Sequence, residues 1–169
     1  MVHSLELVFD DATETAIRAL WTRLAADGIR TPPPTARPHV TLAVADRIDA
    51  QVGAALTGLI AGLPLACRVG GALLFGRDRP VLARLVVPSI ALLELHAAIG
   101  AAAAPWSHPA LRPTTAVGRW SPHVTLARRL TADQLGPALR VAARPAELHG
   151  WFVGVRHWDG GARTATALS

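Results

Sequence analysis

The hexapeptide PHVTLA occupies residues 38–43 and recurs letter for letter at residues 122–127. Six identical residues that return after 84 positions in a chain of 169 form an internal repeat, which has to be interpreted before any other feature. Alternating valine, threonine and leucine after a proline are typical of a β-strand, in which side chains two positions apart point to the same face. The repeat therefore predicts two strands, each with histidine and threonine on one face and aliphatic residues on the other.

The two predicted strands supply matched pairs of polar side chains, His39 with Thr41 and His123 with Thr125. Each pair lies on a rigid element whose aliphatic underside can be buried against helices. If the strands lie side by side, two imidazoles and two hydroxyls converge on one site. The alternative is that both strands merely repeat a stable β pattern. One His-x-Thr motif would be too short to exclude this alternative, but two copies in matched halves favour a functional site.

Outward from the repeat, periodicity and turn residues predict an α+β chain. The predicted strands cover residues 5–9, 39–46, 65–75, 80–87, 122–127, 147–158 and 162–167, and residues 76–79 join two of them in a hairpin. Each predicted helix follows a capping residue, and the helices run to about residues 26, 61, 104 and 143 after Asp10 or Asp11, Asp49, Ser89 and Thr131. In the third helix we expect four residues to face inward: Ile90, Leu93, Ala97 and Ile99.

The predicted elements fall into two similar halves, at about residues 1–76 and 77–169. Each half reads strand, helix, motif strand, helix, strand, and in each a helix opens soon after the motif strand. This order indicates a duplication, with a pseudo-twofold axis between the two motifs. A duplication that keeps both polar pairs is what a symmetric site needs.

Length and composition place the chain among globular proteins. With 169 residues and 51% hydrophobic content, it can form one domain, or a tightly fused pair of lobes, with a sizeable core. It has no apolar run long enough for a membrane span and begins with no signal-peptide pattern, so we expect a cytoplasmic protein without membrane contact. The single cysteine, Cys67, excludes disulfide frameworks and thiolate zinc sites, and we expect it in the core.

All seventeen basic residues are arginine, and they outnumber twelve acids to give a formal charge of +5. The planar guanidinium matches phosphate oxygens, so this excess suits an anionic ligand. A genome biased toward alanine and arginine would produce the same excess of arginine. We therefore give less weight to the total charge than to arginines near the motifs, such as Arg128.

Two histidines on opposite sides of a site are suited to concerted acid–base chemistry on a phosphodiester. One neutral imidazole takes a proton from water or a hydroxyl, while the other, protonated, donates to the leaving oxygen. Thr41 and Thr125 can donate to phosphate oxygens, and Arg128 can neutralise the developing charge. A metal site is disfavoured because the sequence has neither a His-x-x-x-His pair nor an acid placed as a ligand close to either motif.

The duplicated motif resembles that of the 2H phosphoesterase superfamily, in its 2′-5′ RNA ligase-like branch. The similarity covers essentially the whole chain, and residues 121–128, SPHVTLAR, are similar to the fuller signature of the branch, whereas residues 37–42 match in the core letters only. The resemblance implies an α+β fold with two pseudo-twofold-related lobes, whose antiparallel sheets form a central V-shaped cleft with helices outside. It also implies no metal and no organic cofactor.

The resemblance further implies hydrolysis of 2′,3′-cyclic phosphates or related 2′-5′ phosphodiesters at an RNA terminus or in a nucleotide. His39 and His123 would be general base and acid, in an order that the sequence leaves open, and Thr41 and Thr125 would hold the phosphate, with Arg128 as a third contact. The alternatives are an RNA- or nucleotide-binding module with little turnover, and 2′-5′ RNA ligation. Nothing in the sequence fixes the oligomeric state, and we expect a monomer.

Aromatic residues near the second motif are candidates for stacking on a base. Trp106 and Trp120 lie in the long loop before that motif, where an exposed ring could stack, although a packing role is the alternative for each. The other aromatic residues near the strands are expected in the core: Phe75, Trp151, Phe152 and Trp158.

Overall fold

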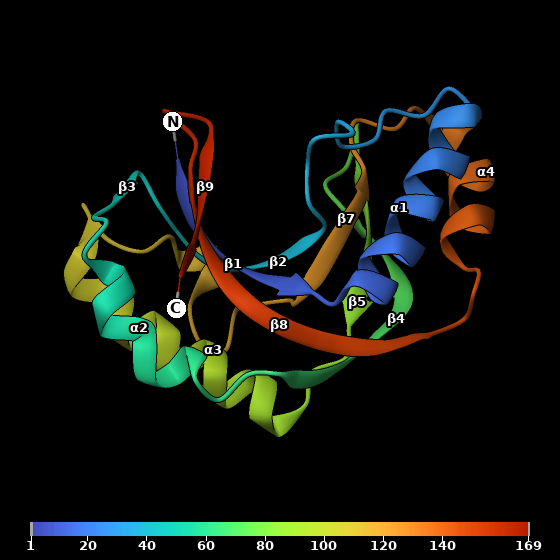
Figure 1. Ribbon diagram of the computed structural model, residues 1–169. Helices are drawn as coiled ribbons and strands as arrows, with labels where there is room; N and C mark the ends of the chain where they lie inside the picture. The colour runs from blue at the N-terminus through green and yellow to red at the C-terminus, as the bar shows by residue number, and fades with distance from the viewer. Residues whose placement is uncertain (1, 169) are drawn as a thin grey trace.

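The computed structural model describes residues 2–168, and its elements follow the predicted order along the chain (Figure 1). The helices are α1 (Asp11–Ala26), α2 (Val52–Ile60), α3 (Ile90–Ala103) and α4 (Ala132–Ala142), with short 3₁₀ turns η1 (Ala104–Trp106) and η2 (Pro113–Thr115). The strands are β1 (His3–Phe9), β2 (His39–Ala45), β3 (Arg47–Ile48), β4 (Leu65–Phe75), β5 (Val81–Val86), β6 (Ser107–His108), β7 (His123–Ala127), β8 (Leu148–Asp159) and β9 (Thr164–Leu168). The α+β class and the hairpin between β4 and β5 are confirmed.

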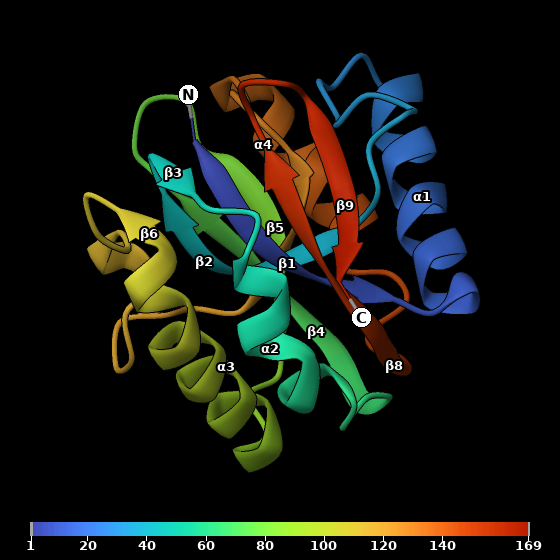
Figure 2. The same ribbon diagram turned by 60° about the vertical axis from the view of Figure 1, so that its left-hand side comes forward.

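The main sheet is antiparallel, with the order β2-β1-β8-β4-β5-β7, and β9 pairs with the last residues of β8 (Figure 2). Read from the β2 end, the order gives two strands of the first sequence half, β2 and β1, and then β8 of the second half. Read from the β7 end, it gives two strands of the second half, β7 and β5, and then β4 of the first half. The two halves therefore exchange their closing strands, because β8 pairs with β1 while β4 pairs with β5. A separate ladder joins β3 to β6.

The helices cover the sheet in two pairs, which lie on opposite flanks (Figures 1 and 2). Helices α1 and α4 contact each other, α1 packs on β7 and β8, and α4 packs on β4 and β5. Helices α2 and α3 contact each other, α3 packs on β2, and α2 packs on β9. The strand β8 bends strongly along its length (Figure 1). The two end strands β2 and β7 contact each other although four strands separate them in the sheet order.

Three of the predicted caps are confirmed. The Asp10 carboxylate accepts the Thr13 N–H at 3.0 Å, and the Ser89 hydroxyl accepts the Leu92 N–H at 3.1 Å. At α4, the Gln134 side chain accepts the N–H of Thr131 at 3.1 Å, as expected of a capping box.

The predicted cap at Asp49 is wrong, because Gln51 occupies the position before α2 and makes no side-chain cap bond. The Asp49 carboxylate instead lies 3.1 Å from His108 Nε2 and 3.4 Å from Arg47 Nε. It therefore contacts one side chain from β6 and one from β3 rather than the start of α2. The first turn of α2 is closed by the main chain alone, through the bond from Val52 N–H to the Asp49 carbonyl.

The predicted inner face of α3 is also wrong for two residues. Ile90 is 77% exposed and Leu93 is 45% exposed, whereas the buried face consists of Leu92, His96, Ile99 and Ala103. Apolar residues surround this helix on every side, so periodicity could not select the face that packs.

The hydrophobic core includes aliphatic residues from both motif strands. Val40, Leu42, Val124 and Leu126 are each at most 1% exposed. Cys67 is buried as expected, and burial raises the pKa of its thiol to about 12. Phe152 is in the core as predicted. No helix within residues 2–168 is long and apolar enough to cross a bilayer.

Candidate active site

The two motif strands present their polar residues as the repeat predicts. On β2, His39 and Thr41 are half-buried while Val40 and Leu42, which alternate with them, are buried, and β7 repeats the pattern with His123 and Thr125. Proline precedes each histidine. Because β2 and β7 contact each other, the two polar faces belong to one region of the molecule.

Both histidines are oriented by the same main-chain contact. Nδ1 of His39 lies 2.8 Å from the carbonyl of Arg37, and Nδ1 of His123 lies 2.7 Å from the carbonyl of Ser121. A carbonyl can only accept, so Nδ1–H of His123 is the donor, whereas Nδ1 of His39 also has Arg156 Nη2 beside it at 3.3 Å. In His123 this bond to the residue two positions back leaves Nε2 for chemistry, while Nε2 of His39 lies 3.4 Å from the Glu6 carboxylate.

Two other predicted site residues lie close enough to His123 to affect its pKa. Burial lowers the pKa of His123 below its ordinary value, the hydrogen bond to Ser121 opposes this, and the charges of His39 and Arg128 lower the pKa further. His123 is therefore neutral at pH 7, with His39 and Arg128 close enough to influence it. The Arg128 side chain is exposed just beyond the end of β7.

Each motif strand accepts a hydrogen bond from a tryptophan of the other half of the chain. The indole N–H of Trp120, from the second half, donates to the carbonyl of Thr41 at 2.8 Å. The indole N–H of Trp21, from α1 in the first half, donates to the carbonyl of Thr125 at 3.0 Å. Trp120 also stacks on His96, with ring centroids 3.9 Å apart and planes 4° apart, so one face of its ring is covered.

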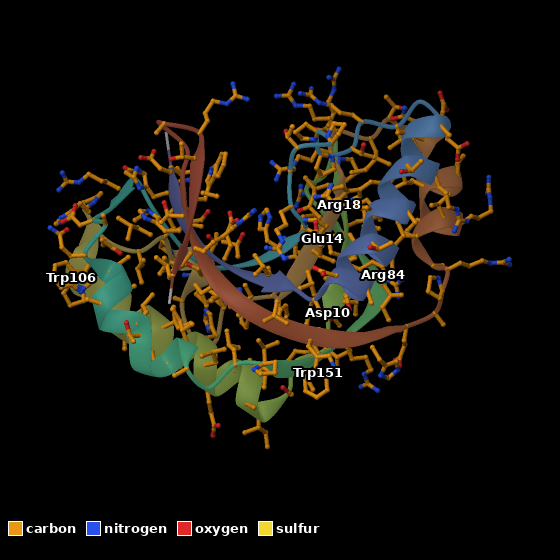
Figure 3. All side chains as sticks on the ribbon, in the orientation of Figure 1. Asp10, Glu14, Arg18, Arg84, Trp106 and Trp151 are labelled. Atoms are coloured by element: carbon orange, nitrogen blue, oxygen red, sulfur yellow. The ribbon has the colours of Figure 1, made fainter. Side chains whose placement is uncertain are left out.

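The structure does not bring Trp106 to the histidines. Trp106 lies at the end of α3, beside β3, and its carbonyl accepts the N–H of Asp49 at 2.9 Å (Figure 3). Its partly buried ring packs against the core. This contact is the packing role that the sequence analysis gave as the alternative to base stacking.

Three residues beside the imidazoles escaped the sequence analysis as site residues. Glu6 on β1 and Arg156 on β8 lie beside His39, and Arg156 Nη2 is 3.3 Å from its Nδ1. The ring of Phe75, which we expected in the core, is only partly buried and lies 4.6 Å from the ring of His123. The signal for Glu6 was present in the sequence, because it is a lone charge within the apolar strand that begins the chain.

Trp151, also expected in the core, is 51% exposed on β8 (Figure 3). This prediction is wrong because β8 alternates its side chains between a covered and an open face, and Trp151 lies on the opposite face from buried Phe152. Trp158 is half-buried.

The groups assembled here suit acid–base chemistry at an anion. The region combines two half-buried imidazoles, two threonine side chains on the same faces, and the positive charge of Arg128. Within the described part of the chain, no three His, Cys, Asp or Glu side chains cluster so that they could hold a metal ion.

Comparisons with known proteins identify the family of the chain. A family model described as the 2′-5′ RNA ligase superfamily matches residues 9–157. No curated protein matches the sequence.

Several solved structures share the fold over nearly the whole of both chains. TT0787 of Thermus thermophilus gives a TM-score of 0.66 at 17% identity and covers 100% of this chain and 96% of its own. E. coli LigT complexed with 3′-AMP gives 0.65 at 15% identity, covering 99% and 94%. Kluyveromyces marxianus Usb1 with uridine monophosphate gives 0.56 at 12% identity, covering 99% and 97%.

Proposed function

The chain belongs to the 2′-5′ RNA ligase superfamily, and we propose that it is a metal-independent cyclic phosphodiesterase. Its substrates are 2′,3′-cyclic phosphates, or related 2′-5′ phosphodiesters, of RNA termini or nucleotides. The observation that carries this proposal is the contact between β2 and β7, because each strand turns a histidine and a threonine to the same side. One such pair alone would be an ordinary polar strand face.

The proposed reaction uses the imidazoles as acid and base. One Nε2 removes a proton from water as its oxygen attacks phosphorus, and the other Nε2–H protonates the leaving ribose oxygen. Thr41, Thr125 and Arg128 stabilise the charge on the non-bridging oxygens. No residue in this scheme needs a metal ion or an organic cofactor.

The proposed substrate site is a V-shaped cleft between two lobes of a single domain. We assign its walls to the polar faces of β2 and β7, with Trp120 beside Thr41 as the residue nearest to an incoming base. Two relatives of this fold were solved with nucleoside monophosphates, LigT with 3′-AMP and Usb1 with uridine monophosphate. These ligands support a nucleotide as the partner of this chain.

Adenosine 2′,3′-cyclic monophosphate and an RNA oligonucleotide with a 2′,3′-cyclic end, each incubated with the protein in EDTA, test the proposal. We expect hydrolysis to a phosphomonoester without added metal, and loss of hydrolysis in His39→Ala and His123→Ala. A requirement for metal, or unchanged hydrolysis in the double variant, would contradict the proposal. Tight phosphate-dependent binding without product would favour the binding-module alternative.

A further inference from the structure

Four exposed arginines lie on the loops that surround the end of β7. Arg128 and Arg129 directly follow this strand, and Arg79 lies in the turn that leads into β5. Arg30 lies in the loop that follows α1. We call these four residues the arginine rim.

Main-chain hydrogen bonds hold the three segments of the arginine rim together. The N–H of Arg128 donates to the carbonyl of Arg30 at 3.0 Å, and the N–H of Leu130 donates to the carbonyl of Pro80 at 3.1 Å. The loop after β7 is therefore fixed between the loop after α1 and the turn before β5. Figure 1 shows the loop after α1 beside the loop after β7 at one end of the molecule. The rim is thus one surface, although its segments lie far apart in the sequence.

The charges of the arginine rim are not paired within the protein. Among residues 2–168, no carboxylate lies within 4.0 Å of a guanidinium nitrogen of the rim. The acids nearest to the rim in sequence are Asp27, Asp78 and Asp133, and none of them forms an ion pair with it. Six other arginines do form ion pairs: Arg18, Arg37, Arg47, Arg68, Arg112 and Arg156. Positive charges held close together repel one another, and a bound anion relieves that repulsion.

The backbone of Arg129 supports a role in ligand binding. Its φ of 58° lies in the left-handed region, which glycine and asparagine enter at lower cost than arginine does. Residues held in this region are concentrated at ligand-binding and active sites. The chain therefore accepts a conformational cost to place a guanidinium at this point.

The arginine rim is continuous with the proposed phosphate site. The charge of Arg128 acts on the imidazole of His123, and Arg129 is the next residue along the chain. In an RNA strand that ends in a 2′,3′-cyclic phosphate, this group is at the 3′ end, so all other phosphates lie on its 5′ side. Guanidinium groups match phosphate oxygens through paired N–H donors. A strand whose end lies between the histidines can therefore place its next phosphates on the rim.

We propose that the arginine rim is a second phosphate-binding site, which binds the internal phosphodiesters of a single-stranded RNA whose cyclic end occupies the proposed active site. This inference rests on the proposed phosphodiesterase function. A mononucleotide has no phosphate that can reach the rim, so the rim favours oligonucleotides over free cyclic nucleotides. Contacts to phosphates carry no information about the bases, so the rim selects for strand length and not for sequence.

Binding of an RNA that cannot be hydrolysed tests the site without catalysis. The probe is a fluorescent adenosine tetranucleotide with a 3′-phosphate, and anisotropy gives its Kd at several salt concentrations. The triple variant Arg30→Gln, Arg79→Gln, Arg129→Gln should raise this Kd about tenfold or more. It should also reduce the slope of log Kd against log salt concentration by about 2, because each single-strand phosphate contact contributes about 0.7. An unchanged Kd and slope would overturn the inference, whether or not the protein is an enzyme.

A second triple variant controls for the loss of positive charge. Arg23→Gln, Arg140→Gln, Arg144→Gln removes the same charge from exposed arginines that line a hollow between α1 and α4. This control variant should leave the Kd and the salt slope unchanged, and an equal effect in it would overturn the assignment to the rim. All six side chains are exposed, so both variants should fold.

Strand length provides the kinetic test. We expect the native protein to show a kcat/KM about tenfold or more higher for an adenosine tetranucleotide with a 2′,3′-cyclic end than for adenosine 2′,3′-cyclic monophosphate, mainly through KM. The rim variant should lose this advantage and the control variant should keep it. Equal kcat/KM for both substrates in the native protein, or an advantage that persists in the rim variant, would overturn the inference and leave the proposed function intact.

Two further outcomes separate the possible failures. Native protein that binds the 3′-phosphate tetranucleotide through the rim but hydrolyses neither cyclic substrate would refute the proposed function and leave the rim as an RNA-binding surface. A polyglutamate peptide or phosphatidylserine vesicles that displace the tetranucleotide at matched charge concentration would overturn RNA as the ligand, in favour of an acidic peptide or a membrane.

Discussion

Trp120 donates its indole N–H to the carbonyl of Thr41 at 2.8 Å, joining residues 79 positions apart in the sequence. Trp21 makes the equivalent bond to Thr125. Each half of the chain thus holds the motif strand of the other half, just where the phosphate is proposed to bind. Because Trp21 lies on α1 and Trp120 lies in the loop before β7, the packing of that helix and that loop helps to fix the positions of Thr125 and Thr41.

Trp120→Phe should therefore affect both stability and catalysis. The lost hydrogen bond should lower the free energy of unfolding by about 1 kcal/mol. A shift of Thr41 should lower kcat/KM about tenfold, because small misplacements of positioning groups are costly. Urea unfolding and steady-state kinetics check these values. Trp151→Phe, at a half-exposed tryptophan, is the control, and an equal effect there would count against the specific role of Trp120.

Thr41→Val and Thr125→Val should separate phosphate binding from folding. Valine keeps the shape of threonine and suits a strand, so the free energy of unfolding should stay within about 1 kcal/mol of the native value. Loss of a hydrogen bond to a charged phosphate should lower kcat/KM about tenfold or more for each variant. Kinetics with a cyclic nucleotide measure the effect, and undiminished kcat/KM in both variants would remove the threonines from the proposed site.

The stability of the protein should fall as the solution is acidified through the histidine range. Burial lowers the pKa values of His96, His123 and His157 in the folded state. The unfolded state, whose histidines titrate near about 6.5, then binds more protons as the pH falls, so stability present above that pH is lost below it.

Urea unfolding at pH 7.5 and pH 5.5 should detect a loss of roughly 1 kcal/mol or more. A His157→Gln variant should lose less on acidification because it lacks one of the three groups. Asp10 and Glu14, whose pKa values are lowered mainly by hydrogen bonds against the effect of burial, titrate below this window. Unchanged stability between the two pH values would contradict the prediction.

The buried arginine of β5 should be a large single contributor to stability. The guanidinium of Arg84 donates to the carbonyls of Val69, Gly70, Pro145 and Ala146, and so ties β4 and β5 to the chain that follows α4 (Figure 3). Arg84→Met would leave these carbonyls without their donor. We expect a loss of about 3 kcal/mol or more in urea unfolding, against little change in Arg68→Met, which removes an exposed arginine.

Local features of the fold were predictable from the sequence because local rules govern them. The caps at Asp10 and Ser89, the hairpin between β4 and β5 and the alternation in both motif strands each depend on a few neighbouring residues. The face of α3 was not predictable, since an apolar helix offers no preferred side. The exchange of β4 and β8 between the halves depends on long-range pairing, about which periodicity says nothing.

The same distinction applies to the site. The two histidines and the two threonines could be selected because a repeated motif marks them, and Arg128 because it directly follows the second copy. Glu6 and Arg156 could not be linked to His39, because they lie 33 positions before and 117 after it and meet it only through the pairing of β1 with β2 and β8. Trp106 contacts Asp49 and packs against the core, because nearness in sequence to a motif does not imply nearness in space.

The exchange of closing strands also bears on how the protein is made. During synthesis β1 leaves the ribosome first, yet one of its two neighbours in the sheet, β8, is translated almost last. The N-terminal half therefore has no complete sheet to form while translation continues, and cannot mature as an independent unit. The chain must therefore be translated to nearly its full length before the sheet that carries both histidines can form.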